Sequence, residues 1–185
     1  MPTAVVVGNF DGLHIGHMKL INTMKHVAHE KHLRTVVVSF SPHPLVYFEK
    51  VEQFEKILLP EEKKHILQHH EIDYYVELPF NKQLADMAPI EFFDYVLITK
   101  LNCAAFIIGS DYCFGKNREG NAETATKICV ERGIHIKNVP MHNCENTGKK
   151  VSSSLIRALI AEGKLKQASK FLGYDYEQVT AGRNK

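Results

Sequence analysis

The chain has 185 residues, of which 44% are hydrophobic and 24% are charged, the balance of one ordinary globular domain rather than a disordered chain. Its 23 Lys and Arg against 21 Asp and Glu give a net charge of +2, too small for a protein dedicated to nucleic acid or a membrane surface. No apolar run approaches the about 20 residues of a membrane span, and no basic leader precedes Asp11. We therefore expect a cytoplasmic protein that acts on small molecules.

Short apolar segments alternate with amphipathic ones along the chain, the pattern of a parallel sheet that helices cover on both faces. The predicted strands are Ala4–Val7, Thr35–Phe40, Tyr74–Leu78, Phe106–Ile108 and Ile134–Val139. The predicted helices are His17–Lys31, Glu61–His70, Pro89–Lys100, Ala122–Arg132, Ser153–Glu162 and Leu165–Leu172. The sequence therefore predicts one α/β domain with a doubly wound, Rossmann-like parallel sheet.

The predicted helices carry end signals. Pro60 and Pro89 suit the first position of a helix, because proline lacks the N–H that is unpaired there in any case. Gly173 suits a helix stop, because glycine adopts the left-handed conformation at low cost. The tail Tyr174–Lys185 is polar, and we expect it to be frayed.

Four cysteines and eleven histidines raise the question of a metal site. Cys103, Cys113, Cys129 and Cys144 form no C-x-x-C pair, which excludes a zinc ribbon or thioredoxin-like motif, and we expect reduced thiols. His65 and His69 are one helical turn apart, but the residues between them lack the glutamate of a zinc protease. We expect such histidines to lie on solvated helix faces and expect no bound zinc.

The loop after the first strand has the composition of an anion-binding turn. It reads Gly8-Asn9-Phe10-Asp11-Gly12-Leu13-His14-Ile15-Gly16-His17. Its glycines let the backbone approach a ligand, and the following helix offers unpaired N–H groups to an anion. The spacing matches neither G-x-G-x-x-G nor a P-loop, which disfavours dinucleotide-dehydrogenase and P-loop chemistry. His14 and His17 can donate hydrogen bonds to phosphate oxygens; the alternative is a helix cap and a structural histidine.

The segment His14-Ile15-Gly16-His17 resembles the HxGH signature of the nucleotidylyltransferase superfamily, which class I aminoacyl-tRNA synthetases share. A second element, Val151-Ser152-Ser153-Ser154-Leu155-Ile156-Arg157, resembles the superfamily's SS[ST]xxR motif. Ser153 can cap a helix, and Arg157 can reach the same anion with a bidentate fork. The alternative is an ordinary serine-capped helix with a surface arginine.

Three further elements narrow the resemblance to the FMN-adenylylating branch. Gly8–Gly12 resembles its first loop, Phe40-Ser41-Pro42-His43-Pro44 resembles its F-x-PHP element, and Gly109–Gly115 resembles its GxDFxFG motif. The stretch from Pro79 to Leu97 also matches in pattern. The resemblance extends from about Val5 to Tyr176, and the chain is similar to the adenylyltransferase module of bacterial bifunctional riboflavin kinase/FAD synthetases.

This resemblance implies a nucleotidylyltransferase-type fold and the reaction of FMN with ATP and Mg²⁺ to give FAD and pyrophosphate. The implied catalytic residues are His14, His17 and Arg157. The implied ATP and phosphate ligands are Gly8, Asn9, Phe10, Asp11, Gly16, Lys150, Ser153 and Ser154. The implied flavin-side residues are Pro42, His43, Pro44, Asp111 and Phe114, with Asp111 also a candidate Mg²⁺ ligand.

Several of these residues have structural alternatives. Pro42 and Pro44 could stiffen a turn, Phe114 could belong to the core, and Asp11 and Asp111 could serve turns or caps. At the serine motif, Lys150 and Ser154 replace an arginine and a threonine that family members usually carry, which keeps a cation and a hydroxyl.

Two other functions stay open at this point. One is a superfamily enzyme with a different phosphate acceptor, and the other is a non-catalytic module that binds flavin nucleotides. We expect residues 1–176 to form the adenylyltransferase domain and residues 177–185 a polar tail, with no riboflavin kinase module. FMN, but not riboflavin, should then be a substrate.

Overall fold

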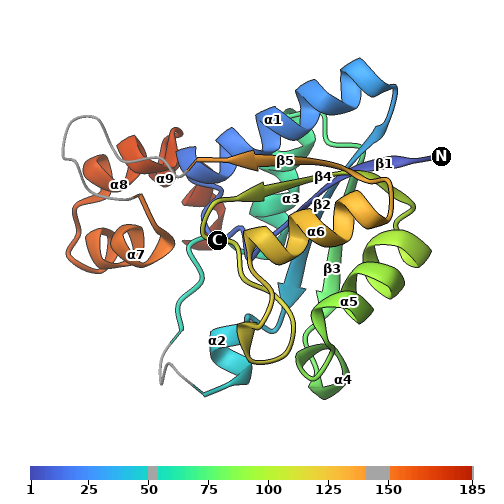
Figure 1. Cartoon of the computed structure of the whole chain (residues 1–185). Helices are drawn as coiled ribbons and strands as arrows, with labels where there is room; N and C mark the ends of the chain where they lie inside the picture. The colour runs from blue at the N-terminus through green and yellow to red at the C-terminus, as the bar shows by residue number, and fades with distance from the viewer. Residues whose placement is uncertain (50–53, 141–150, 185) are drawn as a thin grey trace.

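The computed structural model describes residues 1–49, 54–140 and 151–184 and contains a five-stranded sheet with helices on both faces (Figure 1). The strands are β1 Thr3–Val7, β2 Arg34–Ser41, β3 Tyr74–Pro79, β4 Cys103–Gly109 and β5 His135–Val139. They lie in the order β3-β2-β1-β4-β5, and every neighbouring pair is parallel. The predicted doubly wound α/β fold is confirmed.

The helices agree with the predicted set and add short ones. They are α1 Ile15–Lys31, α2 Pro44–Tyr47, α3 Pro60–His69, α4 Lys82–Ala85, α5 Pro89–Glu91, α6 Ala122–Glu131, α7 Ser153–Ala161, α8 Leu165–Leu172 and α9 Tyr176–Thr180. The predicted helix at Pro89–Lys100 is α5 followed by a π-helical continuation, Phe92–Lys100. Pro60 and Pro89 begin helices and Gly173 ends α8, as predicted.

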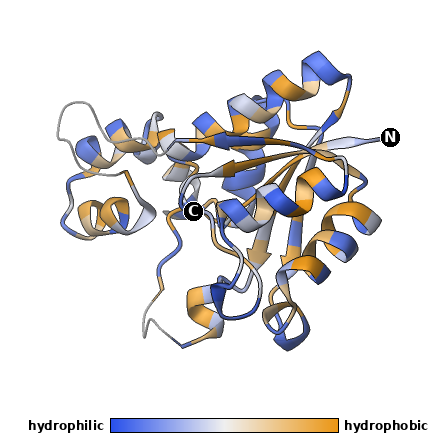
Figure 2. Ribbon diagram, viewed as in Figure 1, coloured by the Kyte–Doolittle hydropathy of each residue, from blue (hydrophilic) through white to orange (hydrophobic). Residues whose placement is uncertain are grey.

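The sheet separates two apolar cores. On one face Val6 and Val37 pack with buried residues of α1, α3, α7 and α8. On the other face Val5 and Val38 pack with the π-helical segment and α6. Figure 2 shows helices that carry both hydrophobic and hydrophilic residues, as amphipathic elements on a buried sheet must, and an edge strand β5 that is largely hydrophilic.

The strand order creates a crevice at the carboxyl ends of β1 and β4. The chain passes from β1 to β2 on one side and later returns to form β4 on the other side of β1. In such sheets, ligands bind where the strand order reverses, because the connecting loops part there. The loop with the HxGH motif, the F-x-PHP element and the GxDFxFG-like segment follow β1, β2 and β4 and therefore lie at this edge, and the serine motif begins α7 after β5.

The expectation of a frayed tail is wrong for residues 174–184. Tyr176 begins α9 and is 7% exposed. Arg183 donates to the Glu62 carboxylate at 2.6 Å and to the carbonyl oxygen of Ile57 at 2.8 Å. The buried ring of Tyr176 and the guanidinium of Arg183 thus hold in place a segment whose sequence is mostly polar.

Candidate active site

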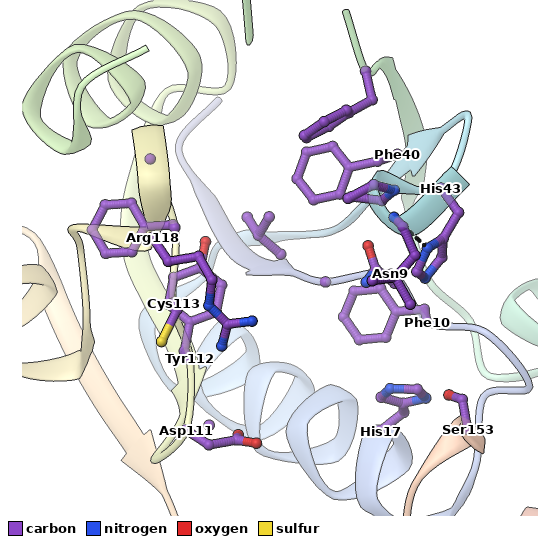
Figure 3. Close-up of a pocket in the computed structure, with 18 of the residues that line it drawn as sticks. Asn9, Phe10, His17, Phe40, His43, Asp111, Tyr112, Cys113, Arg118 and Ser153 are labelled. Atoms are coloured by element: carbon purple, nitrogen blue, oxygen red, sulfur yellow. Dashed lines mark hydrogen bonds between the residues drawn. The ribbon is translucent and has the colours of Figure 1, made fainter. Parts of the chain in front are cut away.

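A cleft of about 1140 Å³ opens at the carboxyl ends of β1 and β4, large enough for a nucleotide. Most of the predicted site residues line it: Gly8, Asn9, Phe10, His14, Gly16, His17, His43, Pro44, Asp111, Phe114, Ser153, Ser154 and Arg157. Pro42 and Asp11 do not line it, and Lys150 lies outside the described residues. Figure 3 shows Asn9, Phe10 and His43 on one side, with Asp111, Tyr112 and Arg118 opposite.

His14 is the N-cap of α1 and is almost completely buried. Its Nδ1 accepts a hydrogen bond from the His17 backbone N–H at 3.3 Å. Because Nδ1 is the acceptor, a neutral His14 carries its proton on Nε2. The predicted helix cap is therefore present, and the cap leaves His14 one N–H that can donate to a ligand.

The rings of His14 and His17 are stacked, with centroids 3.6 Å apart and planes 12° apart. Burial lowers the pKa of His14 to about 4. Burial, with smaller effects from the nearby ionisable groups of His14 and Lys63, also lowers the pKa of His17 well below its usual value. Both imidazoles are therefore neutral near pH 7, and they would act on phosphates as hydrogen-bond donors rather than as cations.

The lowered histidine pKa gives a prediction for stability against pH. Between the unfolded pKa near 6.5 and the folded pKa of about 4, the unfolded chain binds the proton of His14 and the folded chain does not. The free energy of unfolding should therefore fall as pH falls through this window. Urea titrations at pH 7, 6 and 5 should show a shallower fall for His14→Asn, whose side-chain oxygen can accept the cap hydrogen bond in place of Nδ1 and which does not titrate. An unchanged slope would contradict the assignment.

The serine motif forms the start of α7, but its cap is Ser152 rather than the predicted Ser153. Ser152 Oγ accepts from the Leu155 N–H at 3.3 Å. Ser153 Oγ instead donates to the backbone carbonyl of Asp11 at 2.8 Å. The motif is thus fastened to the loop after β1, and the first turn of α7 faces the same cleft as His17.

Arg157 and Asp11 form a largely buried ion pair with a 2.6 Å separation between Nη1 and Oδ2. Asp11 also accepts from the Ile57 N–H at 3.0 Å. Burial raises the pKa of Asp11, while the Arg157 guanidinium acts in the opposite direction. Arg157 also donates to Ser154 Oγ at 3.3 Å and lies over the Phe54 ring at 4.7 Å. Asp11 therefore contacts Arg157 and the Ile57 backbone, whereas Arg157 itself lines the cleft.

Aromatic side chains form one wall of the cleft, and Tyr47 and Phe48 among them were not part of any motif in the sequence analysis. The Phe80 ring meets those of Phe40, Tyr47 and Phe48 with centroids 5.6, 5.2 and 5.7 Å apart. His43 caps α2 by accepting from the Leu45 N–H at 3.1 Å. Tyr47 and Phe48 lie three and four residues after the end of the F-x-PHP element, and this closeness in sequence was the available signal.

The opposite wall is built around Phe114. It is 7% exposed, stacks on Tyr112 with centroids 5.2 Å apart, and packs against Phe93 at 5.4 Å. Phe114 is therefore chiefly a core residue, the alternative considered from the sequence, although it also reaches the cleft lining.

Within residues 1–49, 54–140 and 151–184, no three His, Cys, Asp or Glu side chains gather as a metal site. Cys103, Cys113 and Cys129 are free thiols, and Cys144 lies outside the described residues. Asp111 offers one carboxylate at the cleft. That donor set fits Mg²⁺ that arrives with a triphosphate, because protein-bound Mg²⁺ is usually held by substrate phosphates, waters and one or two carboxylates.

The family model and the similar proteins of known name agree on one family for this chain. Residues 1–155 match the FAD synthetase family. The chain is 33% identical to a FAD synthetase of Listeria monocytogenes, over 93% of this chain and 69% of that protein. It is 31% identical to a bifunctional riboflavin kinase/FMN adenylyltransferase of Buchnera aphidicola, over 92% of this chain. The chain spans 54% of the Buchnera protein.

A solved structure also shares the fold. A crystal structure described as a macrolide-efflux protein from Streptococcus pneumoniae superposes with a TM-score of 0.82 at 30% identity. The alignment covers 94% of this chain and 57% of that one. In the described part of the present chain, none of the helices has both the length and the apolar character needed to cross a membrane.

Proposed function

The chain belongs to the FAD synthetase family, and from this premise we propose that it transfers the adenylyl group of ATP to FMN, giving FAD and pyrophosphate. The observation that carries the proposal is the meeting of His14, His17 and Arg157 with an aromatic wall in one cleft. Two imidazole donors and a guanidinium suit phosphates, and the aromatic rings suit an isoalloxazine.

The reaction needs no covalent intermediate, because the FMN phosphate is already an anionic nucleophile. One of its oxygens bonds to the α-phosphorus of ATP while the bond from that phosphorus to the β-phosphate breaks, and pyrophosphate leaves with the electron pair. Catalysis then consists of positioning and charge stabilisation. When bound with ATP, Mg²⁺ would neutralise phosphate charge, with Asp111 as a candidate ligand.

Different residues of the cleft would serve these two purposes. His14 and His17 would donate to oxygens at the reacting phosphorus, where charge grows in the transition state. Arg157, Ser153 and Ser154 would hold the triphosphate and the departing pyrophosphate, together with Lys150. The glycines of the Gly8–Gly16 loop would let its backbone lie close to the bound nucleotide.

Acceptor choice separates this proposal from another superfamily activity. We expect pyrophosphate release with ATP and FMN, but not with riboflavin, phosphopantetheine or nicotinate mononucleotide. Riboflavin lacks the phosphate nucleophile, and the other two lack a ring system that fills the wall formed by Phe40, Tyr47, Phe48 and Phe80. A coupled pyrophosphate assay across the four acceptors measures this. Faster release with another acceptor would replace FMN in the proposal, and release with none would favour a non-catalytic binding module.

A further inference from the structure

Lys63 is a buried lysine that the roles above leave unused. It lies in α3, is 8% exposed, and its ammonium is 5.8 Å from the centroid of the Tyr75 ring. Burial lowers its pKa. Its Nζ lies 3.4 Å from the backbone carbonyl oxygen of Asn9 and 3.4 Å from Ser39 Oγ. Burying an ammonium costs hydration, so its place behind the loop after β1 calls for a compensating role.

Ser39 contacts the same carbonyl oxygen. It is fully buried in β2, and its Oγ donates to the Asn9 carbonyl at 2.9 Å. A carbonyl oxygen has two lone pairs and can accept from both the hydroxyl and the ammonium of Lys63. The two side chains therefore determine how the peptide between Asn9 and Phe10 is turned.

The orientation of the Asn9–Phe10 peptide also sets the direction of its N–H group. Within the described residues the one cis peptide bond is Ser41–Pro42, so the Asn9–Phe10 peptide is trans, and its N–H points opposite to its carbonyl. The Phe10 N–H therefore points away from Ser39 and Lys63. No partner for it is found among the described residues. Phe10 has a φ of 47°, a left-handed conformation that is costly for a bulky residue and is kept only where the surroundings enforce it.

We propose that Lys63 and Ser39 are positioning residues that hold the Asn9 carbonyl so that the Phe10 N–H donates to a phosphate oxygen of the bound nucleotide. Neither side chain touches the substrate in this role. The positive charge of Lys63 behind the loop also favours an anion bound in front of it. The inference rests on the proposed adenylyl transfer, because it assigns a triphosphate to this side of the cleft.

Lys63→Met tests the role, since methionine keeps the apolar stem and removes the ammonium. We expect ATP affinity in calorimetry to fall about tenfold and kcat/KM for ATP to fall about 10²-fold. FMN affinity, read from flavin fluorescence, should stay within about twofold. The control is Lys64→Met at the next residue of α3, whose exposed side chain pairs with Glu61 at 2.8 Å and should be dispensable. Wild-type ATP binding and turnover, or an equal loss of FMN affinity, would overturn the proposal.

A double-mutant cycle tests whether Ser39 and Lys63 act through the same carbonyl group. Ser39→Ala alone should cost about tenfold in kcat/KM for ATP, and the pair Ser39→Ala/Lys63→Met should cost less than the product of the single losses. Independent, multiplying losses would contradict a shared carbonyl. If Lys63→Met does not fold, Lys63→Leu combined with Ser39→Ala provides the same cycle, because leucine also removes the ammonium. ATP calorimetry keeps this test readable even if the wild-type chain forms no FAD, a result that would overturn the proposed function instead.

Discussion

Replacing His17 with alanine should lower kcat by about 10²–10³, the scale observed when one preorganised donor to a developing negative charge is lost. The centroid of the His17 ring lies 3.6 Å from that of His14 and 5.2 Å from that of Phe10. These two contacts fix the orientation of the His17 ring before substrate binds. Steady-state formation of FAD, followed by chromatography, measures the change. Because the residue lies at the start of α1, secondary structure by circular dichroism should be retained.

The matched control is His29→Ala on the same helix, where the histidine is exposed to solvent. It should leave kcat unchanged, because it lies far along α1 from the cleft. A His17→Ala enzyme that folds and turns over like the wild type would remove His17 from the catalytic residues.

Arg157→Ala should have two separable effects. It removes a cation from the phosphate side, and we expect kcat/KM for ATP to fall about 10²–10³-fold. It also leaves the Asp11 carboxylate buried without its partner, which should lower the free energy of unfolding by about 1–3 kcal/mol. Adding Asp11→Asn should recover most of the stability, because asparagine keeps an acceptor for the Ile57 N–H without a charge.

The double variant decides what Arg157 does. Urea denaturation reports the stability, and FAD formation reports the activity. If Arg157 acts on phosphate, the double variant should be stable and still inactive. Recovery of activity together with stability would mean that Arg157 serves only to neutralise Asp11.

The fold was predictable because its signals are local. Runs such as Thr35–Phe40 and the apolar stripe of α1 specify strands and a helix without knowledge of distant contacts. The cap of α7 was misplaced by one residue because Ser152 and Ser153 both suit a cap. The tail was misjudged because Arg183 is ordered by Glu62, whose proximity no local pattern reveals.

The site was predictable as a set of motifs but not as a set of contacts. The HxGH and serine motifs do meet in one cleft, as their resemblance implies. Asp11 pairs with a residue 146 positions later, and Lys63 lies behind a loop 54 positions earlier, so neither role can be inferred from spacing. The wall around Phe80 likewise gathers rings from β2, α2 and the end of β3.

The most direct test of adenylyl transfer uses ATP labelled at its α-phosphorus, with Mg²⁺ and FMN, and the whole chain as enzyme. The label should appear in FAD, in equal amount to the pyrophosphate released, and none should remain on the protein, because the FMN phosphate attacks directly. Label bound to the protein would contradict direct attack. Absence of labelled FAD from FMN would contradict the assigned reaction itself.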